Sequence, residues 1–232
     1  MHQVTNRDQR LEDAGSVELP SFVPKHQRHR LQRPLYDASK RVLDLTLCLL
    51  SLPLVLPVIA LCTIAIWIEN PGPVFFMQQR TGRFGRRFRM FKLRTMVTNA
   101  EEIKEQFRHL NELTWPDFKI ANDPRVLRVG KFLRKTSLDE LPQIFNVLRG
   151  DMSLVGPRPT SFAADTYSLW HTERLEVLPG ITGLWQLSGR SDVDFDDRLR
   201  LDIEYIRRRT LWFDLVLIFR TVQAVIHSKG AY

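Results

Sequence analysis

Residues 45–68 read LTLCLLSLPLVLPVIALCTIAIWI, a run of 24 residues without a charged side chain. As a helix, such a run is about 36 Å long, enough to cross the roughly 30 Å hydrocarbon core of a bilayer. Pro53 and Pro57 interrupt it. Each proline removes a backbone hydrogen bond and bends a helix. The run therefore predicts a membrane helix with a break in its middle.

Basic residues flank this run on both sides. Residues 25–41 contain six Lys or Arg against one acid, and residues 80–94 contain seven and no acid. A helix that crosses once has its excess of Lys and Arg on one side, because positive charge stays cytoplasmic. Two basic flanks favour a re-entrant segment that enters one leaflet, bends at Pro53 and Pro57 and returns. Ser51 is expected to donate to a carbonyl that a proline frees. A proline-kinked helix that spans the bilayer is the alternative.

The charge balance points to an anionic partner. The 232-residue chain carries a formal net charge of +8, which suits nucleic acid, anionic lipid or a phosphorylated substrate. The membrane segment favours the last two over nucleic acid. Cys48 and Cys62 both lie in the apolar run, so they form no disulfide framework, and they fit a reducing cytosolic setting. The histidines show no cluster at metal-ligand spacing.

The remaining patterns predict an α+β fold that is mostly helical, in three parts. Residues 1–34 are read as a flexible polar and basic tail, 35–70 as the re-entrant membrane helix, and 71–232 as a cytoplasmic catalytic domain with interfacial amphipathic helices. Residues 74–79 and 88–93 are expected to pair as a small β-hairpin. Helices are expected over 99–110, in a short basic segment ending near 134, in an apolar segment through 148, and over 196–208 and 211–226, with turns at 179–180 and 188–190.

The adjacent acids Asp139 and Glu140 are the sharpest candidates for chemistry. They follow a run of basic residues and precede an apolar helix. Two neighbouring carboxylates suit Mg²⁺, which proteins commonly hold with one or two carboxylates plus substrate phosphates. A carboxylate also serves as a nucleophile toward phosphorus. The competing interpretation is a capping box, in which Ser137 and both acids only cap a helix. Pro142 weakens that interpretation if Ser137 is the cap.

Arg158 is the second candidate. Pro157 and Pro159 restrict the backbone on either side, which suits a guanidinium that binds phosphate in a bidentate manner. A proline kink with a surface arginine is equally compatible with the pattern. Arg190, which follows Ser188 and Gly189, is a weaker example of the same kind.

Taken together, these segments resemble the bacterial sugar transferase family, the monotopic polyprenyl-phosphate phosphoglycosyl transferases, in their short catalytic form. The similarity covers about residues 36–228 in a single order. Its motifs are KRVLD (40–44), FKLRTM (91–96), DPR (123–125), SLDELPQ (137–143), FNVLRGDMS (145–153), VGPRP (155–159), PGITG (179–183) and SGR (188–190).

The resemblance implies a reaction and roles for individual residues. A UDP-sugar, with glucose or galactose preferred, gives its sugar-1-phosphate to undecaprenyl phosphate and releases UMP. It further implies that Asp139 is the nucleophile of a covalent aspartyl intermediate, and that Glu140 together with Asp139 holds Mg²⁺. Residues implied to bind substrate phosphate are Lys92, Arg134, Arg158 and Arg190.

The implied setting is the cytoplasmic face of the bacterial inner membrane, where the product starts exopolysaccharide, capsule or O-antigen synthesis. Membrane lipid is the other expected partner, and nucleic acid is not expected. The sequence leaves open the sugar, the polysaccharide pathway and whether the protein forms a homodimer. Two other functions are carried as hypotheses: a non-catalytic, membrane-attached basic scaffold for polysaccharide assembly, and a lipid-phosphate hydrolase that uses the same carboxylates with water.

Overall fold

The computed structural model describes residues 33–111, 120, 122–161, 169–188 and 195–227. The tail predicted over residues 1–34 lies outside these ranges except for its last two residues. Arg190 and the turn predicted around it also lie outside them, apart from Ser188.

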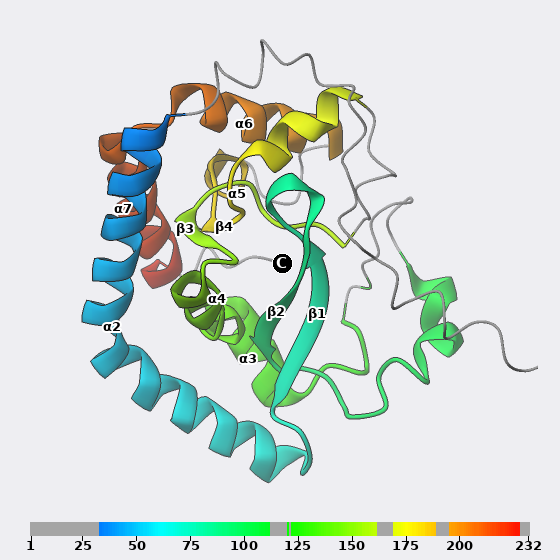
Figure 1. The fold of residues 1–232 in the computed structure, drawn as a ribbon. Coiled ribbons are helices and arrows are strands. Elements are labelled where there is room, and N and C mark those ends of the chain that lie inside the picture. The colour runs from blue at the N-terminus through cyan, green and yellow to red at the C-terminus, as the bar shows by residue number, and fades with distance from the viewer. Residues whose placement is uncertain (1–32, 112–119, 121, 162–168, 189–194, 228–232) are drawn as a thin grey trace, which may run out of the picture.

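The apolar run forms the middle of one helix, α2 (Pro34–Glu69), with Pro53 and Pro57 inside it. Figure 1 shows the ribbon changing direction near the middle of α2, between its blue and cyan parts. The role expected of Ser51 is wrong in detail. Its hydroxyl donates to the carbonyl of Cys48 at 2.9 Å, whereas Pro53 frees the carbonyl of Leu49, four residues before it.

The predicted hairpin is confirmed. Strand β1 (Phe75–Thr81) pairs antiparallel with β2 (Arg87–Leu93), from Phe75 opposite Leu93 to Thr81 opposite Arg87. The loop contains the short 3-10 helix η1 (Arg83–Gly85), in which Phe84 and Gly85 both have positive φ. The hairpin runs across the molecule, and its open end lies near the C-terminal half of α2 (Figure 1).

A second small sheet was not predicted. Strand β3 (Ser153–Val155) pairs parallel with β4 (Gly180–Thr182). The turn expected at residues 179–180 is therefore wrong at Gly180, which begins a strand. A Cβ at Gly180 would lie 2.1 Å from the backbone nitrogen of Gly156. The two backbone segments can therefore approach this closely only with glycine at position 180. Three-residue strands are too short to show an alternating pattern in the sequence.

Several of the other helices match expectation. Over 99–110, where a helix was predicted, turns lead into the 3-10 helix η2 (Lys104–Leu110). Ile103, Phe107 and Leu110 have helical spacing, but none of them is fully buried, so tertiary packing does little to stabilise an α-helix there.

The helices over residues 169–176 and 184–188 were not predicted, and Ser188, expected to begin a turn, ends the second of them. The remaining helices are α3 (Arg128–Thr136), η3 (Leu138–Glu140), α4 (Gln143–Arg149), η5 (Leu169–Glu176), α5 (Leu184–Ser188), α6 (Phe195–Arg208) and α7 (Leu211–Ile226).

Two buried clusters pack against α2, and a third lies between other elements. One joins Ile59, Cys62 and Ile66 to β2 and α3, and the next joins Cys48 to β2 and α4. The third lies between β3, α6 and α7 around Tyr205 and Leu217. Both halves of α2 therefore pack on the same body.

The outer face of α2 is apolar and exposed. Among the described residues, α2 is the one helix long and apolar enough to cross a membrane, with a mean hydropathy of 2.6 over its most apolar stretch, of which 17% is buried. Helix α7 also exposes large apolar side chains. The exposed set on these two helices includes Leu50, Leu54, Leu61, Trp67, Ile68, Trp212 and Phe219.

Candidate active site

The acidic pair lies on a single turn between two helices. Ser137 ends α3 in the left-handed conformation, with φ of 57°, and Leu138–Glu140 then form η3. The Ser137 side chain makes no capping hydrogen bond. The capping-box interpretation is therefore wrong. Pro142 directly precedes α4, so it breaks no bond inside a helix.

Glu140 is held by two cations. Lys92 Nζ lies 2.8 Å from Oε1, and Arg158 donates through Nη2 to Oε1 at 2.5 Å and through Nη1 to Oε2 at 3.2 Å. Burial by itself would raise the pKa of Glu140, but the charges and hydrogen bonds of Arg158 and Lys92 lower it well below its ordinary value. Glu140 is thus a permanent anion that organises two candidate phosphate-binding cations.

Asp139 is in the opposite situation. Its side chain is buried, and no donor within the described ranges is hydrogen-bonded to its carboxylate. Burial raises the pKa of Asp139; the charge of Lys92 opposes this and the charge of Glu140 adds to it. Ordinary buried carboxylates are satisfied by hydrogen bonds. A buried carboxylate without donors in the described structure, beside several cations, is a candidate for a functional group.

Strand β2 positions Lys92 through a buried amide on α4. Asn146 is completely buried. Its Oδ1 accepts from the backbone N–H of Phe91 at 2.9 Å, and its Nδ2 donates to the carbonyl of Arg89 at 2.8 Å. Two hydrogen bonds to the residues just before Lys92 hold β2 at a set distance from α4.

Arg158 is supported from behind. Pro157 and Pro159 are buried on either side of it, and Arg174 donates to the backbone carbonyl of Arg158. Arg174 also forms a buried ion pair with Asp202 of α6 at 2.7 Å. The stiff mount predicted from the two prolines is thus reinforced by an arginine that the sequence did not single out.

Arg134 lies near the same turn. Its Nε donates to Thr95 Oγ1 at 2.9 Å, and its charge lowers the pKa of Asp139. The structure therefore brings together Lys92, Arg134, Arg158, Asp139 and Glu140, while Arg190 lies outside the described residues.

Sequence reasoning missed two residues that shape this site: Asn146 and Arg174. Asn146 leaves one signal, because it is a polar residue inside the apolar stretch IFNVL. Arg174 leaves no signal, since it is one basic residue among many and its partner is 28 residues away.

The donor set fits Mg²⁺ bound together with substrate. Asp139 and Glu140 are adjacent carboxylates, and Asp139 has oxygens that no described donor occupies. Among the described residues, no three His, Cys, Asp or Glu side chains gather into a metal cage. Phosphate oxygens and water would complete the coordination shell, as is usual for Mg²⁺.

The family model described as bacterial sugar transferase matches residues 35–228. The galactosyl transferase CpsE of Streptococcus agalactiae is 44% identical over 195 residues, covering 83% of this chain and 43% of that protein. The undecaprenyl-phosphate galactose phosphotransferase of Salmonella typhimurium is 41% identical over 222 residues, covering 91% of this chain and 47% of that protein.

A relative of similar length is also found. The exopolysaccharide production protein ExoY of Rhizobium meliloti is 38% identical over 224 residues, covering 94% of this chain and 97% of that protein. The chain thus spans less than half of the first two relatives and nearly all of ExoY.

Proposed function

The chain belongs to the bacterial sugar transferase family, and from that premise we propose that it transfers a sugar-1-phosphate from a UDP-sugar to undecaprenyl phosphate and releases UMP. Relatives are named as undecaprenyl-phosphate galactose and glucose-1-phosphate transferases, which favours a hexose donor. The observation that carries the proposal is Asp139, a buried carboxylate without hydrogen-bond donors in the described structure, beside a cation-bound Glu140.

Asp139 is assigned as the nucleophile. In the first half-reaction one of its oxygens forms a bond to the sugar-proximal phosphorus, the phosphoanhydride bond breaks, and UMP leaves with the electron pair. In the second half-reaction a phosphate oxygen of undecaprenyl phosphate attacks the same phosphorus, and the Asp139 carboxylate leaves. The covalent step removes the need for both substrates to be bound at once.

The cations of the site make the approach of anions favourable. Lys92 and Arg158 lie on Glu140, and Arg134 is close enough to lower the pKa of Asp139. We assign these three to substrate phosphates, whose charge they offset as the anionic nucleophile approaches. Arg190 is assigned the same role on the family resemblance alone. A Mg²⁺ ion held by Asp139 and Glu140 would neutralise further phosphate charge when bound.

The packing of α2 supports a re-entrant anchor. Its N-terminal half contacts the body through Tyr36 and Lys40, which bind Asp214 of α7. At its other end Glu69 accepts from the backbone N–H groups of Arg128 and Val129 at 2.7 and 2.8 Å. A spanning helix would separate these two ends by the thickness of a bilayer. Both ends held on one body favour a helix that enters and leaves on the same side.

We therefore place the catalytic domain on the cytoplasmic face of the bacterial inner membrane. The exposed apolar faces of α2 and α7 would lie in lipid or at its surface. There the site meets a soluble nucleotide sugar and a lipid whose phosphate lies at headgroup depth. The product would begin exopolysaccharide, capsule or O-antigen synthesis.

The test uses the full chain purified in detergent with Mg²⁺, undecaprenyl phosphate and a panel of nucleotide sugars. We expect UMP release with one or a few UDP-hexoses and transfer of labelled sugar phosphate to the lipid. Release of inorganic phosphate or free sugar phosphate without an acceptor would instead indicate a hydrolase. No turnover with any donor, with membrane binding intact, would indicate a scaffold.

A further inference from the structure

Strand β1 begins with three consecutive exposed apolar side chains. The exposed fractions are 45% for Phe75, 41% for Phe76 and 54% for Met77. Successive residues of a strand point to opposite faces, so one buried face cannot account for all three. A run of exposed large apolar residues marks a binding or membrane surface rather than a core.

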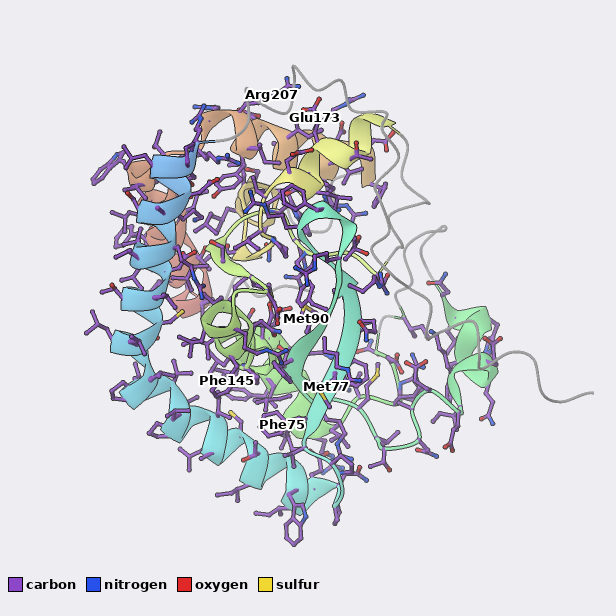
Figure 2. All side chains as sticks on the ribbon, viewed as in Figure 1. Phe75, Met77, Met90, Phe145, Glu173 and Arg207 are labelled. Carbon is purple, nitrogen blue, oxygen red and sulfur yellow. The ribbon has the colours of Figure 1, made fainter. Side chains whose placement is uncertain are left out.

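The run is continuous with the membrane anchor. Trp67 and Ile68, at the end of α2, are exposed to 57% and 70%, and the turn after them leads directly into β1. The carbonyl of Val74, just before β1, accepts from the backbone N–H of Arg94 at 2.9 Å. Figure 2 shows Phe75 and Met77 at the end of the hairpin that faces the C-terminal half of α2.

The other end of this surface reaches the acidic pair. Phe76 lies directly opposite Lys92 in the antiparallel ladder. Directly opposite residues project on the same face, with Cβ atoms about 5 Å apart. Lys92 in turn bonds Glu140. Along this face β1 changes from apolar Phe76 to polar Gln78 and basic Arg80, away from the membrane anchor.

From this juxtaposition we propose that Phe76, on the face of β1 that carries Lys92, binds the polyprenyl chain of the phosphorylated acceptor where it leads from the bilayer to Lys92, while Phe75 and Met77 project from the opposite face at the membrane end of the strand. The inference rests on the proposed function. An amphipathic anion with a long apolar tail matches a surface that is apolar at the membrane end and cationic at the other. The tail would lie along the start of β1 while its phosphate lies at Lys92, beside Asp139.

The test compares two phenylalanines of one hairpin. Phe76→Ser removes the proposed contact, and Phe84→Ser removes an almost equally exposed ring, at 42%, from the loop at the far end. Losing one apolar contact changes the ratio of kcat/KM between two substrates by roughly 10-fold to 200-fold. We expect Phe76→Ser to raise the KM for undecaprenyl phosphate about tenfold, with no comparable change for a short-chain isoprenyl phosphate or for UMP release without acceptor. Phe84→Ser should behave as wild type.

A wild-type KM for undecaprenyl phosphate in Phe76→Ser would overturn the inference. So would an equal loss with the short acceptor, or a variant whose loss is explained by release from vesicles in a flotation assay. The surface is also tested without turnover, by photocrosslinking a benzophenone-bearing polyprenyl phosphate to the full chain. Crosslinks at Phe76 support it, even if no donor sugar reacts and the proposed function fails. Crosslinks confined to α7 would contradict it.

Discussion

Two regions of the molecule bury carboxylates beside cations, and they differ in how the oxygens are satisfied. One region, the anchor network, joins the first half of α2 to the rest of the protein through the carboxylates of Asp214 and Asp44. In it Asp214 accepts from Tyr36 at 2.6 Å and from Tyr205 at 2.7 Å, and it pairs with Lys40 at 3.0 Å. In the acidic turn Asp139 is buried with cations nearby but, in the described structure, with no hydrogen bond. The first arrangement fastens helices together, and the second leaves a carboxylate available to a substrate.

The anchor network also explains how the first half of α2 is oriented. Asp44 accepts from Ser153 Oγ at 2.6 Å and from the backbone N–H of Leu154 at 3.3 Å, which ties α2 to β3. Directional hydrogen bonds fix rotation and register in a way that apolar contacts do not. The second half of α2 is held mainly by the apolar cluster around Ile59, Cys62 and Ile66, with Glu69 fixing its end.

The largest effect is expected at Asp139. Asp139→Asn keeps the shape of the side chain and removes the proposed nucleophile, so UMP release should fall by at least about 10³-fold, as for other covalent catalysts that lose their nucleophile. Single-turnover release of UMP from the preferred UDP-sugar measures this. A variant that still releases UMP at the wild-type rate would show that the carboxylate without donors is not the reactive one.

Asp214→Asn should damage stability. The change removes the 3.0 Å ion pair of Lys40, which keeps the longer pair with Asp44 at 3.9 Å, and breaking a buried ion pair costs up to about 3–5 kcal/mol. Thermal unfolding in detergent should shift strongly downward, while UMP release per folded molecule stays within a few-fold of wild type. Unchanged stability together with lost activity would reverse the roles given to the two regions.

The two acids of the turn should respond to pH with opposite signs. Burial raises the pKa of Asp139. The contribution of its protonated form to the free energy of unfolding is therefore complete at low pH and is lost as the pH rises through the raised pKa. At pH 7 Asp139→Asn is therefore expected to be more stable than wild type, and the difference should shrink on acidification. Unfolding temperatures at a series of pH values measure this.

For Glu140 the sign is reversed. Because the pKa of Glu140 is lowered in the folded protein, its contribution to the free energy of unfolding is present above the ordinary glutamate pKa. The contribution is lost as the pH falls toward the lowered pKa of the folded state. Glu140→Gln should thus be less stable than wild type at pH 7, by an amount that decreases in acid. Parallel pH profiles for Asp139→Asn and Glu140→Gln would mean that the two acids share one environment.

The smallest effect is expected at Ser153. Ser153→Ala removes one donor to Asp44, and a single hydrogen bond of this kind contributes about 1 kcal/mol, or up to about 3 kcal/mol if the acceptor is left unsatisfied. A modest drop in unfolding temperature with unchanged UMP release is the expected result. A loss of activity at this position would link the anchor network to the chemistry.

Much of the helical framework was predictable, because it depends on local patterns. A short window reveals the apolar run with its prolines, the hairpin, the amphipathic helix predicted over 196–208 and the strongly apolar helix predicted over 211–226. The segment 99–110 misled the prediction, because helical spacing does not make an α-helix when its apolar residues are not buried against the rest of the protein. The β3–β4 pair was hidden because its partners are 27 residues apart and only three residues long.

By itself, then, the sequence determined the apolar anchor and its bend, the acidic pair, and the arginine between two prolines, because each depends on neighbouring residues. Only the tertiary structure decided which cations meet Glu140, that Asp139 is left without donors, and that Asn146 and Arg174 hold the strand and loop that carry Lys92 and Arg158. These contacts join residues tens of positions apart. Their partners are chosen by packing, which no local pattern encodes.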